Sequence, residues 1–262
     1  MRKILMLVLI TLSVQAAQIG VNEKLGDMIP LDMTFINEKG EKVTLEKMMD
    51  GKPTMLSLNY YRCSGICNAQ LADMAEMLGK LDLAENTDYK VITVSFGEGE
   101  TPALAKAKRE TMLKAIPRDF VHDAWHFYVS DGNSSAQLAQ KVGFTYKKEV
   151  SKAGVVDYIH PGTLVMLSPQ GKITRYLNGI AQLPFDVKMA LMEAGEGKVG
   201  PTIAKKLLFC FAYDPKGKTY VFKWEKITGI VMTLIMFGFF FYLVKTTKRE
   251  DDQINHQNKG DD

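Results

Sequence analysis

Apolar and polar positions follow two alternating periods along the chain. Short runs rich in β-branched and aromatic residues predict strands at 31–36, 54–60, 89–96, 125–129, 163–167 and 173–177. Apolar residues recurring every three or four positions predict helices at 43–49, from the cysteines to 78, from about 102 to 115, at 134–142 and at 183–193. Strands alternating with helices, closed by a hairpin and a helix, predict an α/β fold of the thioredoxin-like kind.

The N-terminal end has the pattern of a secretory signal peptide. Arg2 and Lys3 precede an uncharged apolar run at 4–14, and alanines flanked by glutamines follow at 15–18. The run has about 11 residues, whereas a membrane-spanning helix needs roughly 17–25. We therefore expect residues 1–17 to be a signal peptide, with an uncleaved N-terminal anchor as the alternative.

A second apolar segment lies near the other end of the chain. Residues 227–244 contain no Asp, Glu, Lys, Arg or His, and at about 1.5 Å per residue they give roughly 27 Å of helix. Trp224 and Tyr242 lie near its two ends, where amphipathic rings favour the membrane interface. The segment predicts a single transmembrane helix in contact with lipid. A buried core helix is the alternative, but such helices are rarely apolar on every face.

The two end segments together predict how the chain is laid out. A signal peptide directs the following chain outward, and a later span stops its transfer, which leaves the basic residues after 244 on the cytoplasmic side. We expect a signal peptide at 1–17, a folded domain at 18–195, a linker at 196–226, a span at 227–244 and a cytoplasmic tail at 245–262. The folded domain then faces an oxidising compartment.

Composition and charge narrow the class of protein. Hydrophobic residues make up 46% of the chain and charged residues 24%, which excludes wholesale disorder. Lys and Arg number 33 against 30 Asp and Glu, and a net charge of +3 gives no sign of a nucleic-acid partner. Three cysteines cannot build a disulfide scaffold, but two of them can form one bridge or one metal site.

Two of the cysteines have the setting of a reactive site. Cys63 and Cys67 follow the predicted strand at 54–60 and begin a helix, where the helix dipole favours thiolate. Arg62 adds to that effect if its guanidinium points inward. With three residues between them, positions i and i+4 of one helical face lie about 6 Å apart. This spacing suits both redox chemistry and metal binding, and a structural disulfide is the third interpretation. A disulfide that closes so short a loop restricts the unfolded chain little, so stabilisation of the fold is a weak reason for one here.

A metal site built on two thiolates needs a further ligand, and the chain offers four histidines. Two thiolates are soft ligands that select copper, zinc or an iron–sulfur cluster. His122 and His126 are expected to be surface or packing residues, and His256 lies in the predicted cytoplasmic tail. His160 stands directly before the predicted hairpin, whose entry loop lies beside the cysteines in a thioredoxin-like sheet. We therefore predict a metal site of Cys63, Cys67 and His160.

Three segments resemble the Sco/SenC family, namely 59–67 (NYYRCSGIC), 159–162 (IHPG) and 165–172 (VMLSPQGK) followed by Arg175 and Tyr176. The resemblance implies a membrane-tethered, thioredoxin-fold protein that binds copper, Cu(I) or Cu(II), through Cys63, Cys67 and His160. It also implies a role at the copper A centre of cytochrome c oxidase subunit II. Ser64, Asn68 and the C-terminal position of the anchor depart from the family's usual pattern.

The resemblance implies a metallochaperone that delivers copper to the copper-centre subunit of a respiratory oxidase by exchange of thiolate and imidazole ligands. The enzymatic alternative is a membrane-anchored thiol–disulfide oxidoreductase, with Cys63 and Cys67 as redox-active residues, that keeps the client cysteines reduced. A copper-responsive sensor is a third possibility, but the tail is too short for a folded output domain. The implied location is the bacterial inner membrane, with the folded domain in the periplasm and the C-terminus in the cytoplasm.

Three other features admit an ordinary structural explanation. Most methionines, Met74, Met77 and Met166 among them, fall on apolar faces and are expected in the core. Cys210 is expected to be a small apolar residue near the membrane, with a redox role as the alternative. Asp157 either orients His160 or forms a turn.

Overall fold

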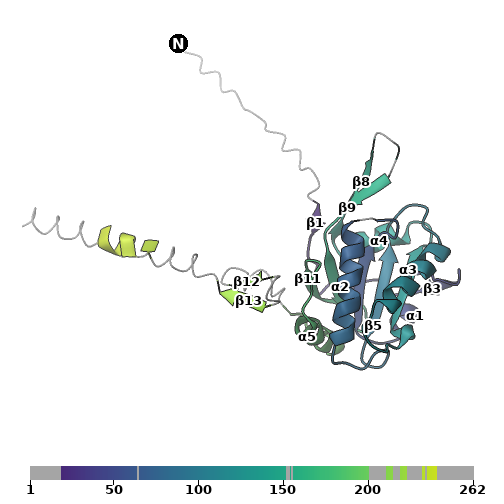
Figure 1. Ribbon diagram of the computed structural model, residues 1–262, viewed down its shortest axis with the longest axis horizontal. Coiled ribbons are helices and arrows are strands. Elements are labelled where there is room, and N and C mark those ends of the chain that lie inside the picture. The colour runs from purple at the N-terminus through teal and green to yellow at the C-terminus, as the bar shows by residue number, and fades with distance from the viewer. Residues whose placement is uncertain are drawn as a thin grey trace, which may run out of the picture. The chain divides into compact units, whose positions relative to one another are not determined.

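The computed structural model describes residues 19–63, 65–151, 154, 156–200, 211–214, 219–222, 232–233 and 235–240 (Figure 1). The chain divides into two compact units, Met1–Thr202 and Ile203–Asp262. In the second unit, β12 (Phe211–Asp214) pairs antiparallel with β13 (Thr219–Phe222). All the chemistry predicted from the cysteines and His160 lies in the first unit.

The first unit is built on a seven-stranded mixed sheet with the order β11-β10-β4-β5-β6-β2-β3. The strands are β2 (Thr34–Ile36), β3 (Lys42–Thr44), β4 (Thr54–Asn59), β5 (Lys90–Ser95), β6 (Trp125–Ser130), β10 (Thr163–Leu167) and β11 (Ile173–Asn178). The central strands β4, β5 and β6 are parallel, so their carboxyl ends meet at one edge. The neighbouring β10 runs antiparallel to β4, so its amino end lies at that same edge.

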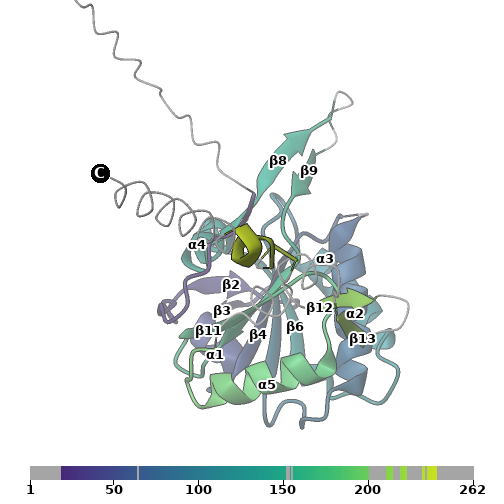
Figure 2. The same cartoon turned by 90° about the vertical axis from the view of Figure 1, so that its left-hand side faces the viewer.

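Helices cover both faces of the sheet (Figures 1 and 2). They are α1 (Leu45–Met49), α2 (Ile66–Lys80), α3 (Pro102–Lys114), the 3-10 turn η1 (His122–Ala124), α4 (Ser134–Lys141) and α5 (Pro184–Gly195). Alternate strand residues point to opposite faces, so Met55 packs in a core with α2, α3 and α5, whereas Leu56 packs in a second core with α1 and α4. Both cysteines belong to the second core.

Two short strand pairs lie outside the central sheet. The first joins β1 (Gly20–Val21) to β7 (Phe144–Thr145). The second is the hairpin of β8 (Lys147–Val150) and β9 (Val156–Ile159), which projects from the body (Figures 1 and 2). Because β9 ends one residue before His160, this hairpin leads the chain into the predicted site.

The structure confirms most of the elements that periodicity predicts and corrects two. Strands β4, β5, β6, β10 and β11 and helices α2 to α5 lie where they are expected. The strand predicted at 31–36 is wrong in its first half, because only Thr34–Ile36 pairs with a neighbour. The helix predicted at 43–49 begins at Leu45: Val43 and Thr44 pair with β2, and the Thr44 side chain caps the helix.

The two predicted membrane-directed segments fall largely outside the described residues. Residues 1–17 lie wholly outside them, as do most of 227–244, so both remain predictions. Residues 232–233 and 235–240 are helical and carry exposed apolar side chains. Across the described part of the chain, no helix combines the length and the apolar character that crossing a bilayer requires.

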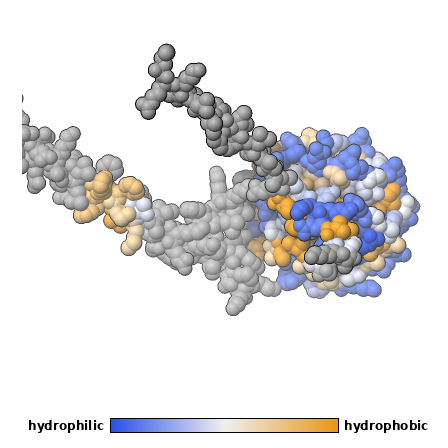
Figure 3. Space-filling model, turned by 90° about the horizontal axis from the view of Figure 1, so that it is seen from above, coloured by the Kyte–Doolittle hydropathy of each residue, from blue (hydrophilic) through white to orange (hydrophobic). Residues whose placement is uncertain are grey.

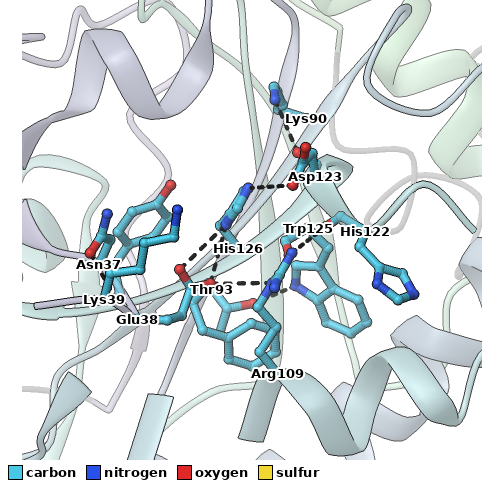
Figure 4. A network of polar contacts seen from close by, with 12 residues as sticks. Asn37, Glu38, Lys39, Lys90, Thr93, Arg109, His122, Asp123, Trp125 and His126 are labelled. Carbon is cyan, nitrogen blue, oxygen red and sulfur yellow. Dashed lines mark hydrogen bonds and ion pairs between the residues drawn. The ribbon is translucent and has the colours of Figure 1, made fainter. Parts of the chain in front are cut away.

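A carboxylate joins three elements at the amino end of β6 (Figure 4). Glu38, between β2 and β3, accepts a hydrogen bond from the backbone N–H of Phe127 at 2.8 Å. Its side chain also lies 3.3 Å from Arg109 Nε of α3 and 3.2 Å from His126 Nδ1 of β6. Its side chain is only 9% exposed, so these partners replace the water that Glu38 loses on folding.

We expect the Glu38→Ala variant to lower the free energy of unfolding by about 2–3 kcal/mol, because it leaves a buried N–H without its acceptor and removes the carboxylate that pairs with Arg109. Urea unfolding of the variant and the parent measures the difference. The matched control is Glu110→Ala, at an exposed position of α3, which is expected to change stability by less than about 0.5 kcal/mol. Equal effects of the two substitutions would contradict the assigned role of Glu38.

Candidate metal centre

The two cysteines lie on either side of the start of α2. Strand β4 ends at Asn59, and α2 begins at Ile66 after Gly65, whose backbone has φ −114° and ψ −123° and lacks a capping side chain. Cys67 is therefore in the first helical turn, whereas Cys63 lies in the loop before it. The expectation that both cysteines share one helical face is wrong, because the non-helical backbone at Gly65 separates them.

Both thiols are free and nearly inaccessible. Cys63 is 6% exposed and Cys67 is 0% exposed, and the structure contains no disulfide between them. The backbone N–H of Gly65 donates to Cys63 Sγ at 3.2 Å. Cys63 and Cys67 are thus not joined by a structural disulfide, and both sulfurs are available as ligands.

The strand arrangement brings His160 to the cysteines. His160 follows β9 and precedes β10, whose residue Leu164 lies opposite Ser57 of β4. Antiparallel pairing therefore sets the start of β10 beside the end of β4, where the cysteine loop begins. His160 Nε2 lies 2.7 Å from Cys67 Sγ, although 93 residues separate them, and the histidine is 5% exposed.

The hydrogen bonds of His160 define its tautomer. Its Nδ1 lies 3.0 Å from the carbonyl oxygen of Pro161. A carbonyl oxygen only accepts, so Nδ1 carries the proton and Nε2 is the unprotonated nitrogen. Nε2 then accepts the S–H of Cys67. The lone pair of Nε2 faces the sulfur, which is the orientation that a shared metal ion requires.

Burial shifts both titrating groups toward their neutral forms. Burial raises the pKa of the Cys67 thiol well above its usual range; the nearby Cys63 adds to the rise, and a hydrogen bond from the Tyr60 backbone opposes it. Burial lowers the pKa of His160, opposed by its Pro161 hydrogen bond and by Asp157. The metal-free pair is therefore a neutral thiol beside a neutral imidazole. The low-pKa thiolate expected from the helix dipole is not found at Cys67.

Glu100 holds the loop that carries Cys63. Its two carboxylate oxygens accept the backbone N–H groups of Tyr61 and Arg62, each at 2.8 Å. The Arg62 guanidinium donates to the carbonyl of Gly99 at 3.1 Å. Arg62 is thus committed to the neighbouring loop, and the inward orientation considered from the sequence is not observed.

Aromatic rings pack around His160. The ring of Phe96 lies 5.3 Å from the imidazole and that of Phe144 lies 6.0 Å from it. Tyr60 and Tyr158 continue this cluster, with ring centroids 5.0 Å apart. These rings supply the burial that lowers the histidine pKa. Sequence periodicity did not single them out, because they come from four separate segments of the chain.

Asp157 plays neither of the roles considered for it. Its carboxylate accepts hydrogen bonds from the hydroxyl of Tyr60 and, at 2.8 Å, from the backbone N–H of Tyr158. The Tyr60 hydroxyl is the main cause of the lowered pKa of Asp157. The contact joins β9, which leads to His160, to the loop that leads to Cys63.

The donor set fits a soft metal ion after a small adjustment. Over the residues that the structure describes, no group of three His, Cys, Asp or Glu side chains is already placed to hold a metal. A metal about 2.3 Å from sulfur and 2.0 Å from nitrogen separates the two atoms by roughly 3.5 Å. Cys67 Sγ and His160 Nε2 lie 2.7 Å apart, closer than a metal held by both atoms allows. Binding thus requires the two groups to exchange the thiol proton for the metal and to move apart.

The other candidate residues lie elsewhere. His122 is exposed in η1, and His126 contacts Glu38 and Asp123 (Figure 4). This agrees with the expectation that the two histidines are surface or packing residues. His256 and Cys210 lie outside the described residues. Met74, Met77 and Met166 are at most 2% exposed, which confirms their place in the core.

Comparisons with known proteins point to one family. The model of the SCO1/SenC family matches residues 23–184. The SCO1 protein homolog of Bacillus subtilis (strain 168) is 29% identical over 155 residues, which are 58% of this chain and 75% of that protein.

Two solved structures share the fold. A crystal structure from Aquifex aeolicus VF5 has a TM-score of 0.56 at 24% identity and covers 66% of this chain and 95% of its own. The crystal structure of Arabidopsis thaliana ScoI with copper bound has a TM-score of 0.51 at 16% identity, covering 63% and 96%. At these identities the likeness shows a shared α/β fold, which is consistent with the thioredoxin-like fold expected from the sequence.

The lowered pKa of His160 predicts a pH-dependent stability. The unfolded state binds the imidazole proton more tightly than the folded state, so the contribution of neutral His160 is present above about pH 6.5 and is lost as pH falls below it. We expect the stability difference between the parent and His160→Gln to shrink from pH 7.5 to pH 5, by at most about 1.4 kcal/mol per pH unit.

Urea unfolding of the reduced, metal-free protein across this pH range measures the difference. The control is His122→Gln, which removes an exposed imidazole. A difference for His160→Gln that stays constant or grows on acidification contradicts the assignment.

Proposed function

The chain belongs to the SCO1/SenC family, and from this membership and the site geometry we propose that it binds copper through Cys63, Cys67 and His160. We propose further that it delivers the copper to the copper-centre subunit of a respiratory oxidase. The copper is cargo, taken up and released by exchange of ligands. The match to the family model covers the segment that contains all three residues.

One observation carries the proposal, the contact between Cys67 Sγ and His160 Nε2 at 2.7 Å. Thiolate and imidazole together favour copper among the metals that proteins handle. Cys63 supplies a second sulfur from the adjoining loop and lies near enough to raise the pKa of Cys67. The set of two sulfurs and one nitrogen leaves an open position at which a client ligand can attack.

The neutral state of the free site explains why uptake depends on protons. Copper binds thiolate and neutral imidazole, so Cys67 must lose its proton on binding. His160 already has its lone pair directed at the site, and its lowered pKa keeps it neutral near physiological pH. A metal-binding event thus displaces the thiol proton and leaves the histidine tautomer unchanged.

The surface around the site suits approach by another protein. Ile66 and Ile159, which adjoin two of the proposed ligands, are 42% and 45% exposed. Viewed from the end at which the β8–β9 hairpin projects, hydrophobic surface lies among hydrophilic surface (Figure 3). Because the ligands themselves are almost inaccessible, direct transfer requires a client to press against this end and displace the loop.

The geometry supports the chaperone over the thiol–disulfide oxidoreductase. A catalytic thiol attacks as an accessible thiolate with a lowered pKa. Cys67 is fully buried with a raised pKa, and Cys63 is 6% exposed. Both properties slow attack on a disulfide, whereas a metal ion can overcome the raised pKa by replacing the proton.

We also propose that the folded domain lies outside the cytoplasm, in the periplasm of a bacterium, anchored by residues 227–244. The described positions in this segment are helical, and their large apolar side chains are exposed: Met232, Ile235, Met236, Phe237, Phe239 and Phe240. Exposed apolar side chains of this density are stabilised by lipid. The signal-peptide pattern at 1–17 gives the outward direction.

Copper titration of the reduced, full-length protein tests the proposed site. We expect one Cu(I) per chain, measured by competition with a chelator of known affinity. Loss of a residue that only hydrogen-bonds to a metal ligand typically lowers metal affinity by roughly 10–100-fold. His160→Ala and Cys67→Ser remove proposed ligands and are expected to lower copper affinity by more than that. For the parent, affinity should rise about tenfold per pH unit for each proton displaced between pH 6 and pH 8.

The matched controls are His122→Ala and Cys210→Ser, which change the same residue types outside the proposed ligand set. The proposal is wrong if His160→Ala and Cys67→Ser bind copper as the controls do. Rapid reduction of a protein disulfide without copper, unaffected by His160→Ala, would instead favour the oxidoreductase.

Reporter fusions test the proposed location. A reporter that is active only outside the cytoplasm is joined after residue 195 or after residue 262. We expect activity at the first position alone, because the apolar segment at 227–244 stops transfer of the chain. Activity at both positions, or at the second alone, contradicts the proposed orientation.

A further inference from the structure

Asn68 connects the cysteine loop to helix α3. Its side-chain Nδ2 donates to the carbonyl oxygen of Cys63 at 2.7 Å. Its Oδ1 accepts from Lys108 Nζ of α3 at 2.8 Å. Both halves of one amide are therefore used, and the chain Lys108–Asn68–Cys63 joins a helix to the residue that carries the first sulfur. We call this series of contacts the tether.

The tether restrains the part of the site that secondary structure leaves free. Cys67 lies within α2 and His160 is positioned by the pairing of β10 with β4. Cys63 lies before the helix, where its backbone N–H makes one long hydrogen bond, to the carbonyl oxygen of Tyr60 at 3.4 Å. The Asn68 side chain reaches back from the first turn of α2 and fixes the Cys63 carbonyl, and its own backbone N–H bonds the Gly65 carbonyl at 3.1 Å.

Lys108 strengthens this restraint through the amide. An ammonium group at Oδ1 polarises the amide and makes its N–H a better donor, since hydrogen bonds in series reinforce one another. Hydrogen bonds that involve a charged group are also stronger than neutral ones. Lys108 is half-buried, and it acts on Cys63 only through Asn68.

We propose that Asn68 and Lys108 are positioning residues that hold the Cys63 sulfur in place for copper, an inference that rests on the proposed function. Neither residue is a ligand, since the tether ends at a backbone oxygen. Without the tether, the loop populates arrangements in which Cys63 is turned away from Cys67 and His160. Copper affinity then falls, and Cys63 becomes more accessible.

Substitutions at the far end of the tether test the proposal, because Lys108 lies outside the ligand set. We expect Lys108→Met to raise the alkylation rate of Cys63 in the metal-free protein and to lower Cu(I) affinity. One lost hydrogen bond changes the ratio of open to placed loop by about fivefold, and the fold-changes in the two measurements multiply to about that value. Lys108→Arg keeps a charged donor and should restore both values. Mass spectrometry of the full-length protein assigns alkylation to each cysteine.

Two matched variants separate positioning from charge and folding. Lys106→Met removes the same charge from an exposed position of α3 and should leave both values unchanged. Asn68→Asp keeps the acceptor for Lys108 but loses the donor to Cys63, so it should act as Lys108→Met does or more strongly. Thermal unfolding of each variant checks that the fold is intact.

The two measurements distinguish failure of this inference from failure of copper binding. If the parent binds no copper, the proposed function fails, while the alkylation rates still report on the tether. The positioning role of the tether is contradicted if Lys108→Met has the same copper affinity and the same Cys63 alkylation rate as the parent. It is equally contradicted if Lys108→Met and Lys106→Met give the same two values. It is also wrong if alkylation rises equally at Cys67, because that result indicates general loosening.

Discussion

The antiparallel pairing of β10 with β4 is the constraint on which the site depends. It brings the amino end of one strand to the carboxyl end of the other, so His160 meets Cys67 at 2.7 Å across 93 residues of sequence. Without β10 beside β4, the loop after β4 would carry two thiols with no histidine next to them. Because β10 is flanked by β11 on its other side, the position of His160 is set by the core of the sheet.

Burial then decides the chemistry that this contact supports. The same low-polarity surroundings raise the pKa of Cys67 and lower that of His160, so both groups favour their neutral forms. A helix N-terminus favours thiolate, but here the cost of desolvating a charge exceeds that effect. A cation that replaces the thiol proton removes this cost, since thiolate and metal charges compensate each other. The site is thus better suited to holding a metal than to presenting a nucleophile.

The sequence was sufficient for most of the elements and for the meeting of His160 with the cysteine loop, because both follow from local patterns and from strand order. It was insufficient for contacts that depend on how separate segments pack. Nothing local marks the Tyr60–Asp157 contact or the placement of Glu38 against Arg109. Cys63 lies outside the helix because the backbone at Gly65 is not helical. Glycine adopts helical and non-helical conformations alike, so a glycine in the sequence does not by itself predict where the helix begins.

The three proposed ligands are held in different ways, and the difference bears on the proposed exchange of copper. Cys67 and His160 are held by a helix and a sheet, whose displacement disrupts many backbone hydrogen bonds. Cys63 is held by a few hydrogen bonds: those of Glu100 to the loop before it, that of Asn68 to its carbonyl and that of the Gly65 N–H to its sulfur. In the proposed function, a client that competes for copper meets least resistance at Cys63, because only a few hydrogen bonds oppose its displacement. We infer that the side chains that restrain the Cys63 loop, as well as the proposed ligands, govern how readily the metal leaves.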